Sequence, residues 1–186
     1  PPLSTPPHQS FLRPTELAQD DTPMIAVVQH ALSQVPGDPD DIWVLLQPTQ
    51  PLRQPKHVRA ALDLLAADPT NTDSVVSVVE VPASHHPSYA CAIMDGQLYG
   101  IDHGEDGWSC YGVAHQPTRR QFVDPVYRRD GTVYAFYRRN VDIRHNGNIY
   151  GNHVQPLIIP ADESCELDTM ADWAALERRL ASPTRD

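Results

Sequence analysis

The sequence is poor in cysteine, lysine and long apolar runs, and each scarcity argues against a class of protein. Its three cysteines form no CxxC pair and no zinc-ligand pattern, and the adjacent His85 and His86 have no carboxylate or cysteine at ligand spacing. Buried or incidental thiols in a reducing cytoplasm are therefore predicted, with the two histidines exposed in a loop. No apolar run is long enough to cross a bilayer, and residues 1–10 lack the pattern of a signal peptide. We expect a cytoplasmic protein with no membrane-spanning segment.

The charge balance is acidic, which argues against a further class of partner. The formal net charge is −10, and only one of the 14 basic residues, Lys56, is a lysine. Nucleic acids and anionic membranes require a basic surface, so neither is a predicted partner. A local group of arginines can still bind a small anion, because guanidinium groups suit carboxylates and phosphates.

A length of 186 residues favours a single domain, and no internal repeat is present. Residues 1–10 are rich in proline and are predicted to be a disordered or unrelated tail, followed by one domain over residues 11–186. Two apolar segments, residues 42–46 and 73–81, flank residues 55–67, whose apolar positions repeat at helical spacing. This pattern predicts a right-handed βαβ unit in which residues 42–46 form a buried parallel strand.

The second half of the chain predicts a different arrangement. Asp95-Gly96 lies between two short β-rich segments and indicates a hairpin, whereas residues 103–117 are predicted to be irregular. Further strands are expected over residues 131–137 and 154–159. Helices are expected at residues 170–180 and up to about residue 34, the latter capped by an acid or Thr22 with Pro23 in its first turn. The predicted fold class is α/β, with an irregular antiparallel excursion.

The segment Leu46-Gln-Pro-Thr-Gln-Pro-Leu-Arg53 follows the strongest predicted strand. In open α/β sheets ligands bind at the carboxyl ends of strands. There Gln47 can donate and accept hydrogen bonds, and Arg53 can hold an anion. A rigid turn between strand and helix explains the segment equally well.

Arginines gather in the second half of the chain. Six lie within about 20 residues of each other: Arg119, Arg120, Arg128, Arg129, Arg138 and Arg139. Such a cluster suits a sugar carboxylate or a triphosphate. Taken alone, a solvated face with weak surface ion pairs is the slightly favoured alternative.

Two carboxylates precede the last predicted helix. Glu166 and Asp168 are two residues apart and point the same way in an extended chain, so they can hold Mg²⁺. Thr169 and Asp172 have the spacing of a capping box, which is the alternative interpretation of this segment. The two interpretations are compatible.

Together these segments resemble the acylneuraminate (sialic acid) cytidylyltransferase family. The resemblance rests on LRPxELAxD at residues 12–20, LQPTxPLR at 46–53, RQ at 120–121 followed by aromatic-Arg-x-[ND]-Gly-x-x-Tyr at 127–134, and LDT at 167–169. Each motif is modest alone, but their shared order over residues 11–180 is specific.

The resemblance implies a Rossmann-like nucleotidyltransferase sheet in a three-layer αβα fold, whose excursion over residues 82–124 is a dimerisation arm. It implies an enzyme that joins an acidic nonulosonic sugar to CMP from CTP, with release of pyrophosphate. It also implies Mg²⁺ as cofactor and a homodimer. The residues carried over are Asp168 and Glu166 for the metal, Asp168 and Arg120 for catalysis, and Gln47, Arg53, Arg128, Tyr134 and Tyr150 for substrate binding.

The chain departs from the family at several positions. It has no GxGxxG, GxxxxGK[ST] or ARGGSK-like loop to hold CTP phosphates, which suggests an N-terminally truncated domain that is inactive as given. Glu166 stands where the family has aspartate, Asp130 where many members have asparagine, and Tyr89 where some have a sugar-binding lysine.

These departures leave two alternative functions. One is the same chemistry on another acid sugar, such as legionaminate, pseudaminate or an eight-carbon keto-deoxy acid. The other is a truncated, non-catalytic protein that binds a sugar or a partner.

Overall fold

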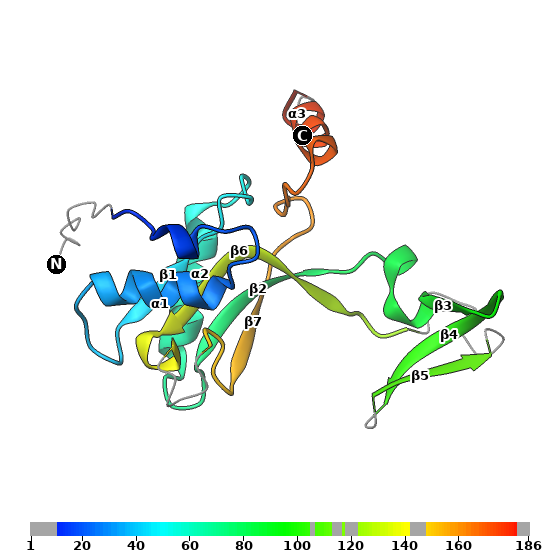
Figure 1. Cartoon of the computed structure of the whole chain (residues 1–186), viewed down its shortest axis with the longest axis horizontal. Helices are drawn as coiled ribbons and strands as arrows, with labels where there is room; N and C mark the ends of the chain where they lie inside the picture. The colour runs from blue at the N-terminus through cyan, green and yellow to red at the C-terminus, as the bar shows by residue number, and fades with distance from the viewer. Residues whose placement is uncertain (1–10, 105–106, 113–116, 118–122, 142–147, 182–186) are drawn as a thin grey trace. The chain divides into compact units, whose positions relative to one another are not determined.

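The computed structural model describes residues 11–104, 107–112, 117, 123–141 and 148–181 (Figure 1). These residues form two compact units. Unit 1 takes its residues from 1–45, 58–76 and 133–155, and unit 2 from 46–57, 77–132 and 156–186. The chain passes between the units repeatedly, so each is built from segments that are distant in sequence. No helix among the described residues combines the length and apolarity needed to cross a membrane.

A four-stranded sheet has the order β1-β6-β2-β7. Its strands are β1 (Ile42–Leu45), β2 (Ser74–Glu80), β6 (Tyr127–Tyr137) and β7 (Val154–Ile158). β1 is antiparallel to β6, with Leu45 opposite Tyr134. Ile42 is 39% exposed, so the strand expected to be buried is partly exposed. The physical reason is that β6 is its one sheet neighbour among the described residues.

Main-chain hydrogen bonds fix the direction of the other strands. The N–H of Tyr137 donates to Asp73 O at 3.4 Å, and the N–H of Val81 donates to Val126 O at 2.9 Å. The two ends of β2 therefore meet opposite ends of β6, so these strands are antiparallel. β1 and β2 consequently run in the same direction, as predicted. They are not neighbours, however, because β6 lies between them.

β7 runs parallel to β2. The N–H of Asp73 donates to His153 O at 2.9 Å, and five residues later Val78 O accepts from the N–H of Ile159 at 2.8 Å. The predicted strand over residues 154–159 is confirmed with nearly the same bounds.

The core of unit 1 joins α1 (Met24–Gln34) to the sheet. Val28 and Leu32, one helical turn apart, belong to one buried cluster with Phe136 of β6. Pro23 is the N-cap residue and no side chain caps the helix. The predicted cap is therefore wrong, because the Thr22 hydroxyl accepts the N–H of Gln19 instead.

The other two α-helices lie where the sequence predicted them. α2 (Pro55–Ala67) has the predicted bounds, and α3 is Met170–Ala181. Short 3-10 helices are η1 (Thr15–Leu17), η2 (Ala83–His85), η3 (Pro87–Tyr89) and η6 (Arg138–Val141).

Unit 2 contains a separate antiparallel sheet of β3 (Cys91–Met94), β4 (Gln97–Gly104) and β5 (Gly107–Gly112). Asp95 and Gly96 have positive φ angles of 50° and 74°, which confirms the predicted hairpin turn. The irregular structure predicted from residue 103 is wrong for β5, which pairs with β4. Glycines conceal this strand in the sequence, because they weaken the alternation and have low strand propensity.

Candidate active site

The loop that follows β1 is closed by its own arginine. The Arg53 guanidinium donates to Gln47 O, and the N–H of Arg53 donates to Gln50 O at 3.4 Å. Burial lowers the pKa of Arg53, while the negative charge of Asp130 opposes this shift. The geometry is that of a rigid turn, and the binding of an anion by Arg53 stays a prediction.

A tight turn in β6 packs against this loop. The buried carboxylate of Asp130 accepts from Thr132 N at 3.1 Å and from Thr132 Oγ1 at 2.6 Å. Gly131 has φ 73°, and a Cβ atom there would collide with Gln47 Oε1 and lie 3.3 Å from Gln50 Nε2. The side-chain amide of Gln47 therefore lies directly against a glycine backbone.

The acidic segment before α3 completes the arrangement. The N–H of Leu167 donates to Thr49 O at 3.1 Å. One residue earlier, Glu166 Oε2 accepts from Arg128 Nη1 at 2.9 Å. These bonds join three segments within unit 2, residues 46–54, 127–132 and 163–169, so Gln47, Arg53, Arg128, Glu166 and Asp168 belong to one locality.

Two further predicted residues lie together in unit 1. The rings of Tyr134 and Tyr150 meet edge to face, with centroids 6.5 Å apart. Tyr134 is 8% exposed, while the backbone N–H of Tyr150 donates to Asn148 Oδ1 at 2.7 Å. The pair is fixed by packing, and its contact with a sugar stays a prediction.

The arginine cluster separates into different roles. Arg138 donates to Leu32 O at 2.7 Å and Val35 O at 2.8 Å, so it caps the C-terminal end of α1. Arg139 pairs with Asp40 and lies over the ring of Tyr137. The exposed ion pair of Arg139 thus fits the predicted alternative of a solvated arginine face, whereas the capping role of Arg138 was not predicted. Arg119 and Arg120 lie outside the described residues, and the catalytic role of Arg120 stays a prediction.

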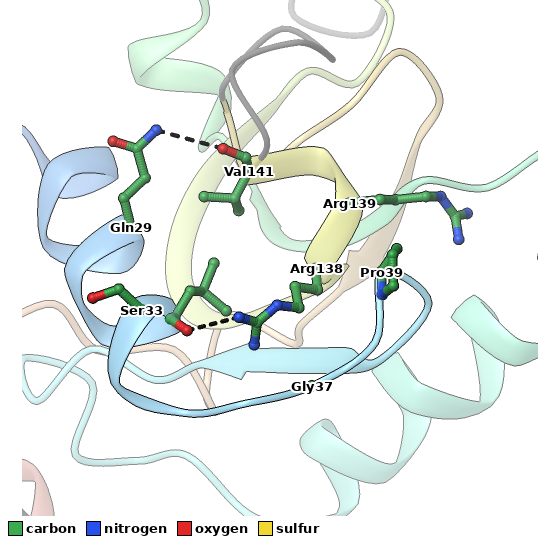
Figure 2. Close-up of a pocket in the computed structure, with 8 residues that line it drawn as sticks. Gln29, Ser33, Gly37, Pro39, Arg138, Arg139 and Val141 are labelled. Carbon is green, nitrogen blue, oxygen red and sulfur yellow. Dashed lines mark hydrogen bonds between the residues drawn. The ribbon is translucent and has the colours of Figure 1, made fainter.

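A cavity of about 330 Å³ opens beside these arginines in unit 1 (Figure 2). The side chains of Gln29 and Ser33 of α1, together with Arg138, line it. In Figure 2 the Arg138 guanidinium points to the end of α1, whereas Arg139 extends away from it. Both guanidinium groups already have protein partners.

One expectation about the histidine pair is wrong. His86 is buried, its Nε2 lies 2.9 Å from Asp124 O, and its Nδ1 accepts the N–H of Ser88 at 3.1 Å. The hydrogen bonds compensate for its burial. Of the two predicted alternatives, buried or incidental thiols, Cys91 and Cys110 fit the second, because both are exposed and neither forms a disulfide.

No protein-family model matches the chain. The chain is 29% identical over 180 residues to CMP-N,N'-diacetyllegionaminic acid synthase of Legionella pneumophila, an alignment that covers 91% of this chain and 68% of that protein. The similarity to this synthase agrees with the resemblance drawn from the sequence motifs.

The fold is also similar to that of a solved structure. The solved structure of CMP:2-keto-3-deoxy-manno-octonic acid synthetase complexed with CTP superposes with a TM-score of 0.55 at 15% identity, over 87% of this chain and 69% of that one. The predicted α/β nucleotidyltransferase fold is confirmed. By their names, both similar proteins are synthetases of CMP-linked acidic sugars, and hence cytidylyltransferases.

The acidic segment has the donor chemistry for a divalent cation. The described residues include no group of three or more His, Cys, Asp or Glu that could hold a metal. Mg²⁺, however, is usually bound by one or two carboxylates together with substrate phosphates. Asp168 is exposed, and Glu166 takes part in an ion pair whose side chains are 38% and 48% exposed. Asp168 and Glu166 are therefore carboxylates of the kind that such a cation uses, and their binding of a metal stays a prediction.

The alternative role of this segment is confirmed for its neighbours. The Thr169 N–H donates to Asp172 Oδ2 at 2.7 Å, and the Asp172 N–H donates to Thr169 Oγ1 at 3.3 Å. This is the predicted capping box at the start of α3. Asp172 therefore caps α3, so the predicted metal ligands of this segment are Asp168 and Glu166.

Sequence reasoning missed the residues that hold the acidic segment in place. Lys56 and His57, at the start of α2, both contact Glu163. The only hint in the sequence is that Lys56 is its single lysine.

Proposed function

We propose that this protein transfers CMP from CTP to an acidic nonulosonic sugar and releases pyrophosphate. The main structural support is the bond of 3.1 Å from Leu167 N to Thr49 O, which places the acidic segment beside the loop of Gln47. Without this contact, the predicted sugar-binding residue Gln47 and the predicted metal ligands Glu166 and Asp168 would have no direct connection. The similarity to a synthase of CMP-N,N'-diacetyllegionaminic acid supports the same reaction.

Each predicted residue has a role that follows from its chemistry. The Gln47 amide can donate to and accept from sugar hydroxyls, and Arg120 can grip the sugar carboxylate with two hydrogen bonds. The Tyr134 and Tyr150 rings are suited to packing against the sugar. Arg53 and Arg128 add positive charge for the anionic substrates. The pair of Arg128 with Glu166 is exposed enough to be exchanged for substrate contacts.

In the proposed reaction the anomeric hydroxyl of the sugar attacks the α-phosphorus of CTP and gives up its proton to the solvent. The bond from this phosphorus to the pyrophosphate oxygen breaks, and pyrophosphate leaves. Such transfer depends on positioning and on compensation of negative charge. Mg²⁺ held by Asp168 and Glu166 would supply part of that compensation.

The test is pyrophosphate release from CTP by the product of the complete reading frame, with a panel of acid sugars. The panel contains N,N'-diacetyllegionaminic acid, N-acetylneuraminic acid, pseudaminic acid and the eight-carbon keto-deoxy acid. We expect release with at least one sugar, and its loss in Asp168→Ala with the fold retained. Absence of release with every sugar overturns the enzymatic function and leaves the non-catalytic alternative.

We also propose a homodimer in which the β3–β4 hairpin contacts a second copy of the chain. Ile93 and Leu98 lie opposite each other on these strands and are 77% and 52% exposed. Adjacent exposed apolar side chains mark interaction sites. Light scattering should give a dimer for the wild type and a monomer for the double variant Ile93→Asp and Leu98→Asp. Met170→Asp, at a position 80% exposed on α3, is the control and should remain dimeric.

We place the protein in the cytoplasm. Cys91 and Cys110 are exposed and form no disulfide, which suits a reducing compartment. Fractionation of cells that express the complete gene checks this location, and recovery outside the cytoplasm would contradict it.

A further inference from the structure

Glu163 connects the acidic segment to the start of α2. Its carboxylate pairs with Lys56 Nζ, and its Oε2 lies 2.7 Å from His57 Nε2. The side chain of His57 is 5% exposed and that of Glu163 is 21% exposed, so this contact is largely shielded from water. Shielding strengthens the contact with His57, whereas Lys56, whose side chain is 58% exposed, adds an ion pair at the surface.

The hydrogen bonds of His57 define its role in this contact. Its Nδ1 accepts the backbone N–H of Gln54 at 3.2 Å, while its own backbone N–H donates to Gln54 O at 3.0 Å. A neutral imidazole whose Nδ1 accepts carries its proton on Nε2. His57 therefore donates from Nε2 to Glu163, and the same ring caps the start of α2.

The electrostatic setting favours an ionised Glu163. The first turn of α2 contains no acidic residue of its own, so Glu163 supplies a negative charge near the positive end of the helix dipole. The hydrogen bond from Lys56, followed by that from His57, lowers the pKa of Glu163. The carboxylate is thus charged at neutral pH.

The acidic segment is fixed at two points to one continuous stretch of chain. Glu163 contacts residues 56 and 57, and Leu167 N–H donates to Thr49 O at 3.1 Å. Glu166 and Asp168 lie on either side of Leu167. Movement at Glu163 would therefore be transmitted along four residues to the bond of Leu167.

We propose that Glu163, clamped by Lys56 and His57, is a positioning residue that sets the place of Glu166 and Asp168 beside the Gln47 loop. The expected effect on catalysis rests on the proposed function, whereas the expected effect on the bond between Leu167 and Thr49 does not. Residues that orient metal ligands commonly change metal affinity or activity 10–100-fold when replaced.

The structural consequence is measured by hydrogen exchange of the Leu167 amide, whose protection reports the bond to Thr49. Glu163→Gln keeps the shape of the side chain and removes its charge, and should speed this exchange about ten-fold through local opening. Asp162→Asn is the matched control, because it removes a neighbouring exposed carboxylate, and should leave the exchange unchanged. Unchanged exchange in Glu163→Gln overturns the inference. If that variant does not fold, Lys56→Met provides the same measurement.

The catalytic consequence is measured by varying Mg²⁺ in the pyrophosphate assay. Glu163→Gln should raise the Mg²⁺ concentration at half-maximal rate about ten-fold, with kcat at saturating Mg²⁺ within about two-fold of wild type. Lys56→Arg retains a cation and should behave as wild type. If Glu163→Gln lowers both kcat and Tm but leaves the Mg²⁺ concentration at half-maximal rate unchanged, Glu163 has a purely structural role and the inference is overturned. An inactive wild type would overturn the proposed function alone, because hydrogen exchange of the Leu167 amide still tests whether Glu163 holds the acidic segment in place.

Discussion

The side-chain amide of Gln47 lies against the backbone of Gly131, at a point where an added Cβ atom would collide with Gln47 Oε1 unless that side chain moved. The contact joins the loop after β1 to the turn in β6, more than 80 residues later in the sequence. Gly131 also has a φ of 73°, which glycine adopts without strain. This glycine therefore serves both the turn and the placement of the glutamine.

The first prediction separates these two roles. Gly96 has a similar φ of 74°, but a Cβ atom added there would meet no other atom within 4 Å, so Gly96→Ala introduces backbone strain alone. We expect Gly96→Ala to lower the free energy of unfolding by about 1–2 kcal/mol. Gly131→Ala should cost about 0.5–1.5 kcal/mol more, because the new methyl group forces the flexible Gln47 side chain out of its conformation. Urea unfolding of both variants measures the difference, and equal losses would show that the contact with Gln47 is unimportant.

The second prediction distinguishes two carboxylates that lie four residues apart. Asp172 accepts hydrogen bonds that cap α3, whereas Asp168 is exposed. Asp168→Asn should reduce pyrophosphate release about 100-fold or more, with Tm unchanged. Asp172→Asn should lower Tm and largely retain the rate. The reverse assignment of these effects would remove Asp168 from the proposed metal site.

Local patterns predicted the elements of the fold well. The bounds of α2 follow from apolar residues at helical spacing, and the β3–β4 turn follows from Asp95-Gly96. The neighbours of each strand were not predictable in this way. β6 lies between β1 and β2 although it follows β2 by more than 40 residues, and no local pattern specifies such a pairing.

In the candidate site, too, the residues could be predicted from the sequence but their long-range contacts could not. The family resemblance selected Gln47 and the acidic segment, and the structure places their backbones together through Leu167 and Thr49. A bond between main-chain atoms has no signature in residue type, so composition alone could not indicate it. The contact of His57 with Glu163 spans 106 positions of sequence and was missed for a similar reason.

The third prediction concerns the arginines that support the fold. Arg138 donates two charged hydrogen bonds to the last carbonyls of α1. Arg138→Met should therefore lower the free energy of unfolding by about 2 kcal/mol, since it leaves these carbonyls unpaired. Arg139→Met removes a partly exposed ion pair and a contact with the Tyr137 ring, and should cost about 1 kcal/mol or less. Chemical denaturation compares the two, and a larger loss for Arg139→Met would contradict the capping role of Arg138.

The fourth prediction is a pH dependence of stability that originates at Asp73. Burial raises the pKa of Asp73, but the backbone N–H groups of His153 and Asn152, at 2.9 and 2.8 Å, and the nearby positive charges outweigh it, so the net shift is downward. A carboxyl group with a lower pKa in the folded state binds fewer protons there than in the unfolded chain. Its contribution to stability is therefore fully present above the unfolded pKa of about 3.9 and is lost as pH falls through the folded value.

Urea unfolding of the wild type and Asp73→Asn between pH 7 and pH 2 tests this linkage. The difference in free energy of unfolding between the two proteins should be constant near neutral pH and should shrink below about pH 4, because protonation removes the charge that the variant already lacks. Asp63→Asn, at an exposed position of α2, serves as the control and should follow the wild type over the whole range. A difference for Asp73→Asn that stays constant down to pH 2 would show that the charge of Asp73 does not stabilise the turn at residues 151–153.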